Sequence, residues 1–209
     1  YKIGSCRHSD LATFSMHPLK TITTGEGGMV TTNNLFFYKK IIRFRSHGID
    51  RDVKKHWKYN IKEYGFNYRL SDLNCALGLS QLKKVNKFIN DRRRIYNIYK
   101  KELNKYKNYI NLISIDQRTK PSFHLILIKI NFKKLKKNKD DLLNYLKKKN
   151  FFCQQHYIPI FNFSAYDKQK KFSNSKEYYQ SSLSLPIYYN LEKKIIEKII
   201  SLIVGYLKS

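Results

Sequence analysis

One lysine lies between a short apolar segment and a glycine-rich turn, an arrangement that can support nucleophilic chemistry. Lys20 follows residues 11–14, which are mostly apolar, and precedes the run Gly25-Glu26-Gly27-Gly28. Residues 29–32 are β-prone, so Lys20 and the glycines are expected in the connection between two strands. Glycines there permit positive φ and close approach of the backbone to a ligand. A partly desolvated lysine amine near other cations has a lowered pKa and can form a Schiff base with a carbonyl, which is the chemistry of pyridoxal-phosphate enzymes.

The segment around Lys20 resembles the active-site lysine motif of the DegT-type sugar aminotransferases, which are fold type I pyridoxal-phosphate enzymes. Six further blocks follow in the order that this family uses: Arg45-Ser46-His47-Gly48, Gly65-Phe66-Asn67-Tyr68-Arg69-Leu70-Ser71-Asp72, Cys75-Ala76-Leu77-Gly78-Leu79-Ser80-Gln81-Leu82, Phe123-His124-Leu125, His156-Tyr157-Ile158-Pro159 and Leu183-Ser184-Leu185-Pro186. One glycine-rich turn is a weak signal, whereas ordered blocks across the whole chain are a specific one. Within the family, the pattern most resembles the C4 aminotransferases of nucleotide-linked 4-keto-6-deoxy sugars, as in pseudaminic acid assembly.

The resemblance implies an α/β fold that is the carboxyl part of a fold type I transferase. Residues 1–72 would end the cofactor-binding large domain, residues 73–106 would form a long linking helix, and residues 107–209 would form a small α/β domain. In the family the lysine motif lies near the middle of the chain, so this sequence is expected to cover only the carboxyl half. The helix N-terminus that cradles the phosphate, the side chain that stacks on the cofactor ring and the aspartate that pairs with its nitrogen would precede it, and Asp10 is not that aspartate. We therefore expect this chain alone to be inactive, and a truncated interaction module is the alternative reading.

Apolar spacing predicts the secondary structure that positions these residues. From Ser71, a candidate N-cap, apolar residues recur at three- and four-residue intervals as far as Leu103, which predicts one long helix. Downstream we expect strands at residues 125–130, 151–160 and 183–187, and helices at residues 139–149, 175–182 and 195–206. Strands that alternate with helices indicate an α/β small domain.

The resemblance also assigns roles near the lysine. Lys20 would bind the cofactor as a Schiff base, the alternative being an exposed turn lysine. Ser15 would bind the cofactor phosphate through its hydroxyl, or be an ordinary strand serine. His17 would contact cofactor or substrate, or be a structural histidine.

Further residues are matched to the family's substrate and interface positions. Asn67 would reach across a dimer interface to a cofactor phosphate, or simply form a turn. Arg69 would assist there, or form an ion pair that supports the loop. His47 would lie near the sugar nucleotide, or order its own loop. His156 and Tyr157 would face the substrate, or form a buried strand edge, and the shared sites would make a homodimer necessary for activity.

The activity implied by the resemblance is a transamination in two halves. An amino donor, by analogy glutamate, gives its amino group to the cofactor, which passes it to the C4 ketone of a sugar that is most simply UDP-linked. Lys20 would move the protons in both halves. Ping-pong kinetics are expected. Some family members carry histidine in place of this lysine and eliminate a hydroxyl, so the lysine favours amino transfer.

Composition is that of a folded chain with a very basic surface. The 209 residues are 42% hydrophobic and 15% aromatic, enough to bury a core and to argue against disorder. The formal net charge is +27, which raises nucleic-acid binding as a competing hypothesis. The lysines, however, are spread along the chain in short clusters without a dense arginine tract, which favours a solvated enzyme surface.

Other features narrow the compartment and the chemistry. No segment approaches the roughly 18 apolar residues of a membrane span, and the start has neither a signal-peptide layout nor an initiator methionine. We expect a cytoplasmic protein and an incomplete chain. Cys6, Cys75 and Cys153 are far apart without a CxxC pair, so we expect reduced, mostly buried thiols and no metal site.

Overall fold

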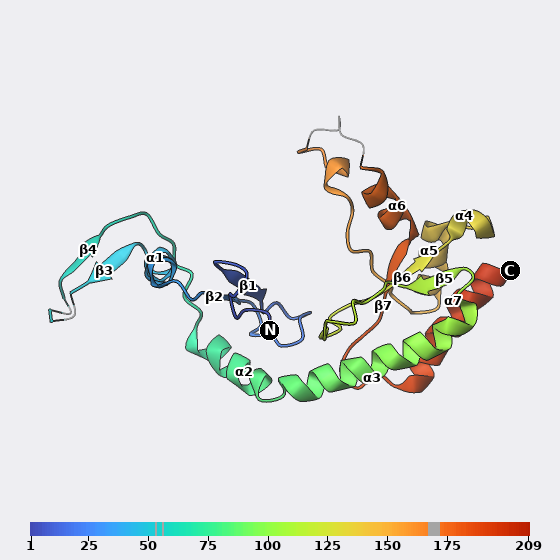
Figure 1. Cartoon of the computed structure of the whole chain (residues 1–209), viewed down its shortest axis with the longest axis horizontal. Helices are drawn as coiled ribbons and strands as arrows, with labels where there is room; N and C mark the ends of the chain where they lie inside the picture. The colour runs from blue at the N-terminus through green and yellow to red at the C-terminus, as the bar shows by residue number, and fades with distance from the viewer. Residues whose placement is uncertain (53, 56, 167–171) are drawn as a thin grey trace. The chain divides into compact units, whose positions relative to one another are not determined.

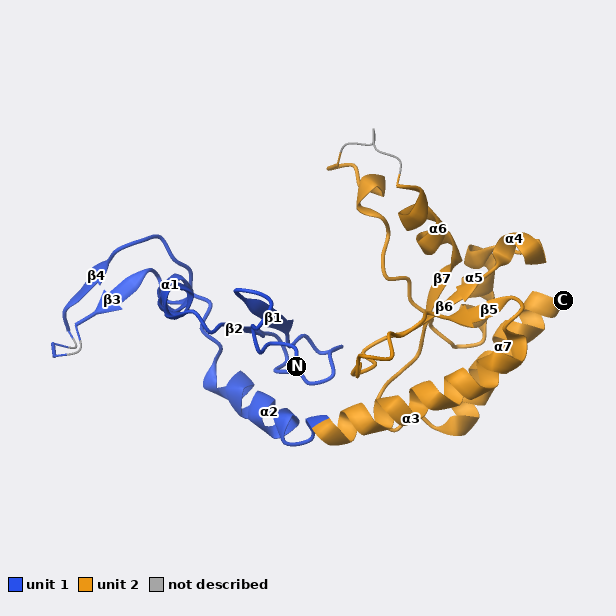
Figure 2. Cartoon of the chain, viewed as in Figure 1, with its two compact units in different colours: residues 1–85 blue, residues 86–209 orange. Residues whose placement is uncertain are grey.

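The chain folds as two compact units. The computed structural model describes residues 1–209 apart from 53, 56 and 167–171. The first unit is Tyr1–Val85 and the second is Asn86–Ser209 (Figure 2). The boundary between the units therefore lies within residues 73–106, the segment predicted as a linking helix.

Two antiparallel hairpins form the strands described in the first unit (Figure 1). Strand β1, Ala12–Ser15, pairs with β2, Gly28–Thr31, so that Ser15 lies opposite Gly28. Strand β3, Ile49–Arg51, pairs with β4, Tyr59–Ile61. The first hairpin confirms the prediction that Lys20 and the glycines connect two strands.

The helices of the first unit begin at polar side chains that cap them. Helix α1, Leu35–Arg45, starts after Asn34, whose side chain accepts a hydrogen bond from the backbone N–H of Phe36. Helix α2, Asp72–Leu82, starts after Ser71, whose hydroxyl accepts from the N–H of Asn74, as the sequence predicts. These caps satisfy backbone donors that a helix leaves unpaired at its first turn.

Buried apolar side chains are missing from the described part of the first unit. All of the buried hydrophobic residues among the described residues have numbers of 95 or higher, and they form one cluster in the second unit. In the first unit Met29 is 51% exposed, Leu79 63% and Tyr64 99%. Because folding of a small unit depends on buried apolar area, the first unit needs a covering surface to be stable.

The second unit is a three-stranded antiparallel sheet with helices. Its strands are β5, Ile110–Leu112, β6, Ile126–Ile130, and β7, Ser182–Leu185, in the spatial order β5-β6-β7. Its helices are α3, Val85–Leu103, which begins at the unit boundary, η1, Asn104–Tyr106, α4, Phe132–Leu135, α5, Lys139–Lys148, η2, Ile160–Asn162, α6, Ser173–Ser181, and α7, Lys193–Lys208.

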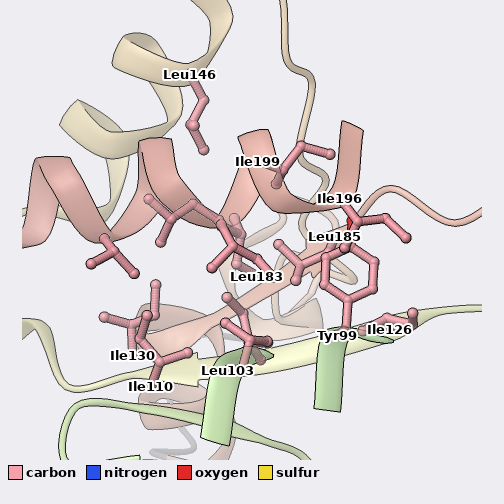
Figure 3. Close-up of a cluster of buried hydrophobic side chains, with 14 of the residues drawn as sticks. Tyr99, Leu103, Ile110, Ile126, Ile130, Leu146, Leu183, Leu185, Ile196 and Ile199 are labelled. Atoms are coloured by element: carbon pink, nitrogen blue, oxygen red, sulfur yellow. The ribbon is translucent and has the colours of Figure 1, made fainter. Parts of the chain in front are cut away.

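The core of the second unit lies between the sheet and the apolar faces of α3, α5 and α7. Figure 3 shows Tyr99 and Leu103 of α3, Ile196 and Ile199 of α7, and strand residues such as Leu183 gathered in one cluster. In β6 the side chains of Ile126, Ile128 and Ile130 are buried while Lys129 is exposed, so one face of the strand enters the core. Spacings of four in α3 and of three and four in α7 place their apolar residues on single faces.

The structure corrects two predictions of secondary structure. The single helix predicted from Ser71 to Leu103 is two helices, with a break at Lys83 and Lys84. No glycine or proline marks this break, and the apolar spacing continues through it, so the pattern does not reveal it. The strand predicted at residues 151–160 is also absent: within it only Gln154 forms a bridge to β7, and Pro159, which has no N–H to donate, precedes η2.

The other predicted elements are present with small shifts of their ends. Strands β6 and β7 and helices α5, α6 and α7 correspond to the segments expected from apolar spacing. Helix α1, the β3–β4 hairpin and β5 carry no pattern that the sequence interpretation used. Among the described residues, no helix combines the length and the apolar character needed to cross a membrane.

Candidate active site

The loop that carries Lys20 is closed at its base by the backbone of Met16. The carbonyl of Met16 accepts from the N–H of Thr24 at 3.1 Å and from the hydroxyl of Thr23 at 2.9 Å. The N–H of Lys20 donates to the carbonyl of His17 at 2.9 Å. Lys20 is half-buried, so the loop holds the amine-bearing residue in a defined, partly desolvated turn.

Thr24 anchors this loop in the first unit. Its side chain is only 2% exposed, and its hydroxyl donates to the carbonyl of Glu26 at 2.7 Å. The side-chain amide of Asn74, on α2, donates to the carbonyl of Thr24. A Cβ on Gly27 would lie 2.6 Å from Oγ1 of Thr24, and a Cβ on Gly78 would lie 2.8 Å from its Cγ2. Both positions must therefore remain without a side chain for Thr24 to sit where it does.

Ser15 and His17 lie in the same loop region as Lys20. The Oγ of exposed Ser15 accepts from the N–H of His17 at 3.4 Å. Nδ1 of His17 accepts from the N–H of Leu19 at 3.3 Å, while its Nε2 lies 3.8 Å from a carboxylate oxygen of Glu26. The structure thus brings together three predicted site residues, and it shows that His17 also orders the loop.

The second group of predicted residues lies on two segments that run side by side. Ser46 and Asn67 form an antiparallel bridge, and the N–H of His47 donates to the carbonyl of Phe66 at 2.9 Å. The close approach of the two segments requires Gly48, directly after His47, because Gly48 has a φ of +71° and a Cβ there would lie 1.6 Å from the carbonyl oxygen of Glu63. His47 and Asn67 are held next to each other as a result.

A basic hollow lies beside these segments, with His47 and Arg69 in its wall. We call it the Arg69 hollow; its volume is about 910 Å³, and its walls are Tyr38, Lys39, Ile42, Arg43, Ser46, His47, Ile49, Asp50, Arg51 and Arg69. Part of its charge is balanced by two ion pairs. Nζ of Lys62 lies 2.7 Å from Oδ2 of Asp50, and Nη1 of Arg43 lies 3.4 Å from Oε1 of Glu63. The hydrogen bond from Lys62 lowers the pKa of the Asp50 carboxyl. The hollow suits an anionic ligand.

His156 and Tyr157 lie in the second unit, outside any strand. Nδ1 of His156 is 2.6 Å from Oγ of Ser184 on β7. The ring of Tyr157 meets that of His156 edge-on, with centroids 4.7 Å apart and planes at 90°, and Tyr157 is 70% exposed. The structure therefore does not place these residues on a buried strand edge.

The cysteines differ from one another in their surroundings. All three are free, and Cys6 and Cys153 are half-buried, whereas Cys75 is exposed, so the prediction of mostly buried thiols is wrong for Cys75. Burial raises the pKa of the Cys153 thiol to about 12. Within the described residues, no three His, Cys, Asp or Glu side chains are grouped as metal ligands would be.

The sequence relationships of the chain identify its family. Residues 2–204 match the model of the DegT/DnrJ/EryC1/StrS aminotransferase family. This chain belongs to that family. The predicted family is thereby confirmed.

The names of relatives in the DegT/DnrJ/EryC1/StrS family refer to different nucleotide sugars. Over 196 residues the chain is 39% identical to the UDP-4-amino-4,6-dideoxy-N-acetyl-beta-L-altrosamine transaminase of Campylobacter jejuni subsp. jejuni serotype O:23/36 (strain 81-176), a match that covers 92% of this chain and 50% of that protein. It is 30% identical over 186 residues to the GDP-perosamine synthase of Escherichia coli O157:H7, covering 88% of this chain and 48% of that protein. The chain spans about half the length of the curated relatives it matches.

Solved structures of the DegT/DnrJ/EryC1/StrS family show the same fold. Helicobacter pylori PseC, an aminotransferase involved in the biosynthesis of pseudoaminic acid, matches with a TM-score of 0.88 at 30% identity, covering 96% of this chain and 54% of PseC. The predicted fold class, an α/β fold that forms part of an aminotransferase chain, is confirmed.

Sequence reasoning missed several residues that support the candidate site. Thr24 and Ser184 lie inside motifs that were recognised, but neither carried a predicted role. Asn74 and Lys139 stand in helices as ordinary polar residues, and only their burial and contacts in the structure distinguish them.

Proposed function

We propose that the protein containing this chain is a pyridoxal-phosphate-dependent aminotransferase that converts the C4 ketone of a nucleotide-linked 4-keto-6-deoxy sugar into an amine. The observation that carries this proposal is the closed loop that fixes Lys20, in a chain of an aminotransferase family. The 39% identity to a transaminase of a UDP-linked sugar supports a UDP-sugar as substrate and a role in surface-glycan or nonulosonic acid biosynthesis.

The functional groups that the loop carries fit pyridoxal phosphate. Lys20 supplies a primary amine for the cofactor aldehyde, and Ser15 supplies an exposed hydroxyl for a phosphate oxygen. Gly25 and Gly27, both at positive φ, leave the turn free of side chains next to the lysine. When bound, the cofactor supplies the electron-withdrawing ring that stabilises negative charge on the carbon losing its proton.

Lys20 has the proton-transfer role in this proposal. In the first half of the reaction its amine would take a proton from the α-carbon of the amino donor, which we propose is glutamate. In the second half it would deliver a proton to C4 of the sugar. The short, anchored loop would hold the amine in place for both transfers.

The charge of the Arg69 hollow supports an anionic group as its ligand. Lys39, Arg43, Arg51 and Arg69 contribute four cations to its walls, against the carboxylate of Asp50. A guanidinium pairs with phosphate oxygens through parallel hydrogen bonds. We propose that Arg69 and Asn67 bind the cofactor phosphate in a homodimer with shared sites, and that His47, His17, His156 and Tyr157 contact the nucleotide sugar.

The apolar surface of the first unit also supports a shared or larger assembly. Its described apolar side chains are at least partly exposed, so residues beyond this unit are needed to cover them. The predicted inactivity of this chain by itself, its predicted cytoplasmic location and the identity of the donor remain predictions.

The test compares Lys20→Ala with Lys83→Ala in the full-length protein. Lys83 is an exposed lysine of the same unit, at the end of α2, and is the matched control. Lys20→Ala should abolish both the visible absorbance of the lysine-bound cofactor and the amino transfer, whereas Lys83→Ala should retain both. Unchanged absorbance and turnover in Lys20→Ala would contradict the role given to Lys20, whereas the lack of both in the unmutated protein would favour the interaction-module alternative. Tight, steeply salt-dependent binding to DNA without amino transfer would favour the nucleic-acid alternative.

A further inference from the structure

We propose that Ser184 is a positioning residue, whose hydroxyl fixes the imidazole of His156 for contact with the nucleotide sugar. The inference rests on the proposed function, which places His156 next to the substrate. Its structural basis is the distance of 2.6 Å between Oγ of Ser184 and Nδ1 of His156. A contact this short between a hydroxyl and a ring nitrogen is a well-formed hydrogen bond.

Ser184 is itself rigidly held. Its side chain is 3% exposed, and it lies on β7 between the core residues Leu183 and Leu185. Its backbone pairs with Leu127 of β6 on one side. On the other side its N–H donates to the carbonyl of Gln154 at 2.8 Å, and its carbonyl accepts from the N–H of Gln154 at 3.1 Å. The hydroxyl therefore acts from a fixed point of the sheet.

The segment that carries His156 has a second anchor at the neighbouring residue, Gln155. Nζ of Lys139, at the start of α5, donates to the side-chain carbonyl of Gln155 at 3.1 Å and to the backbone carbonyl of Tyr179. The ammonium also lies 4.0 Å from the centroid of the Tyr179 ring. Lys139 is only 8% exposed, so this charge is enclosed by its partners. Gln154, Gln155 and His156 are each held by a separate contact as a result.

Helix α3 fixes the chain that follows β7. The hydroxyl of Tyr99 donates to the carbonyl of Pro186 at 3.1 Å, and the guanidinium of Arg92 donates to the carbonyl of Ile187 at 3.3 Å. The strand that carries Ser184 is therefore paired along its length, and the residues that follow it are held by α3. Displacement of the Ser184 backbone away from His156 would require several of these bonds to break together.

The contact has a consequence for the ring of His156. A hydrogen bond at Nδ1 restrains rotation about the side-chain bonds, and the edge-on contact with Tyr157 restrains the plane of the ring. Both residues are those proposed to face the sugar nucleotide. Loss of the Ser184 hydroxyl should therefore weaken substrate binding through His156, while the amino-donor half of the reaction, which involves no sugar, should be spared.

A double-mutant cycle in the full-length protein tests this inference. Ser184→Ala, His156→Ala and the double variant are compared for binding of UDP-4-amino-4,6-dideoxy-N-acetyl-beta-L-altrosamine and for the rate of the donor half-reaction. Ser184→Ala should weaken binding about fivefold to tenfold, the worth of one hydrogen bond, and leave the donor rate within about twofold. In the His156→Ala background, Ser184→Ala should have no further effect, because residues that act through one another are non-additive.

Ser182→Ala is the matched control for the strand. Ser182 lies two residues earlier on β7, on the same face, and is 5% exposed. Its variant should leave binding within about twofold. If Ser184→Ala does not fold, Ser184→Cys keeps a similar volume with a weaker hydrogen-bonding group and should show a smaller loss of the same kind.

The outcomes separate the two proposals. The inference is overturned if Ser184→Ala weakens binding equally in the presence and absence of His156, or if Ser182→Ala weakens it as much. It is also overturned if His156→Ala binds the sugar normally, and the proposed function then still stands on Lys20→Ala. Amino transfer that persists in Lys20→Ala would instead remove the proposed function itself.

Discussion

The side-chain amide of Asn74 donates a hydrogen bond to the backbone carbonyl of Thr24, joining α2 to the loop of Lys20. The two residues are fifty positions apart in the sequence. The backbone N–H of Asn74 also donates a hydrogen bond to the hydroxyl of Ser71, so the same residue completes the cap of α2 and secures the loop. The position of Lys20 therefore depends on a helix that lies far from it along the chain.

Replacement of Asn74 by alanine should loosen this loop. The carbonyl of buried Thr24 would lose its donor, which costs about 1–3 kcal/mol in the free energy of unfolding. We also expect weaker retention of pyridoxal phosphate by the full-length protein, measured by titration of the cofactor absorbance. Asn97→Ala, at an exposed position of α3, is the control and should change stability by less than about 0.5 kcal/mol. Equal effects of the two variants would contradict the role given to Asn74.

Gly48→Ala and Gly205→Ala should have opposite effects on stability. At Gly48 the φ of +71° and the approach of the Glu63 carbonyl oxygen to 1.6 Å from a Cβ require the backbone to move, so more than about 1 kcal/mol should be lost. Gly205 lies in α7 with nothing within 4 Å of a Cβ, so alanine there should add about 0.5–1 kcal/mol through helix propensity. Denaturant unfolding of the full-length protein measures both. A stable, fully active Gly48→Ala variant would show that the His47 loop tolerates rearrangement.

Arg92→Met should destabilise the second unit. The guanidinium is 7% exposed and donates to the carbonyls of Phe123, His124 and Ile187 at 3.3–3.4 Å. Burial lowers the pKa of Arg92, so its charge is held at a cost that these carbonyls offset. Methionine would leave the acceptors without this donor, and we expect a loss of about 2 kcal/mol in the free energy of unfolding. Arg93→Met, whose side chain contacts only exposed Asn90 among the hydrogen bonds described, should stay within about 0.5 kcal/mol.

Stability should fall as the pH rises above about 9. Burial raises the pKa of Cys153 from its ordinary 9.0 to about 12, and burial also raises the pKa of Tyr99 above its ordinary 10.0. Between pH 9 and 12 the unfolded chain therefore loses the Cys153 proton while the folded chain keeps it. The native state then binds more protons, so the free energy of unfolding decreases with pH, by up to about 1.4 kcal/mol per pH unit for each such group.

Cys153→Ala isolates the thiol contribution to this pH dependence. The variant should be less stable than the parent protein below pH 9 because of the cavity, but its loss of stability above pH 9 should be shallower. Between pH 7 and 8.5 the two curves should run parallel, because the thiol is then protonated in both states. Equal slopes above pH 9 would show that Cys153 ionises as readily in the folded protein as in the unfolded one.

The sequence alone determined the family and the position of the chemistry. The motif around Lys20 and the ordered motifs that follow it as far as Leu185 are recognised from residue types at neighbouring positions, which the sequence shows directly. The hairpin around Lys20, the cap at Ser71 and the elements β6, β7, α5, α6 and α7 follow from local apolar spacing and capping, so they were predicted closely. The break at Lys83 and the loss of the strand at residues 151–160 were not, because packing in separate units and the pairing of sheet edges are set by distant residues.

Only the tertiary structure decided which residues support the site. The bond from Asn74 to Thr24, the contact of Ser184 with His156 and the enclosure of Lys139 each join positions that no local pattern relates. Hydrogen bonds of this kind form only after the core has fixed the backbone, because their value depends on burial and on geometry within a few tenths of an ångström. The sequence thus determined that Lys20 stands where an aminotransferase lysine would stand, and the fold decided what holds it and its neighbours in place.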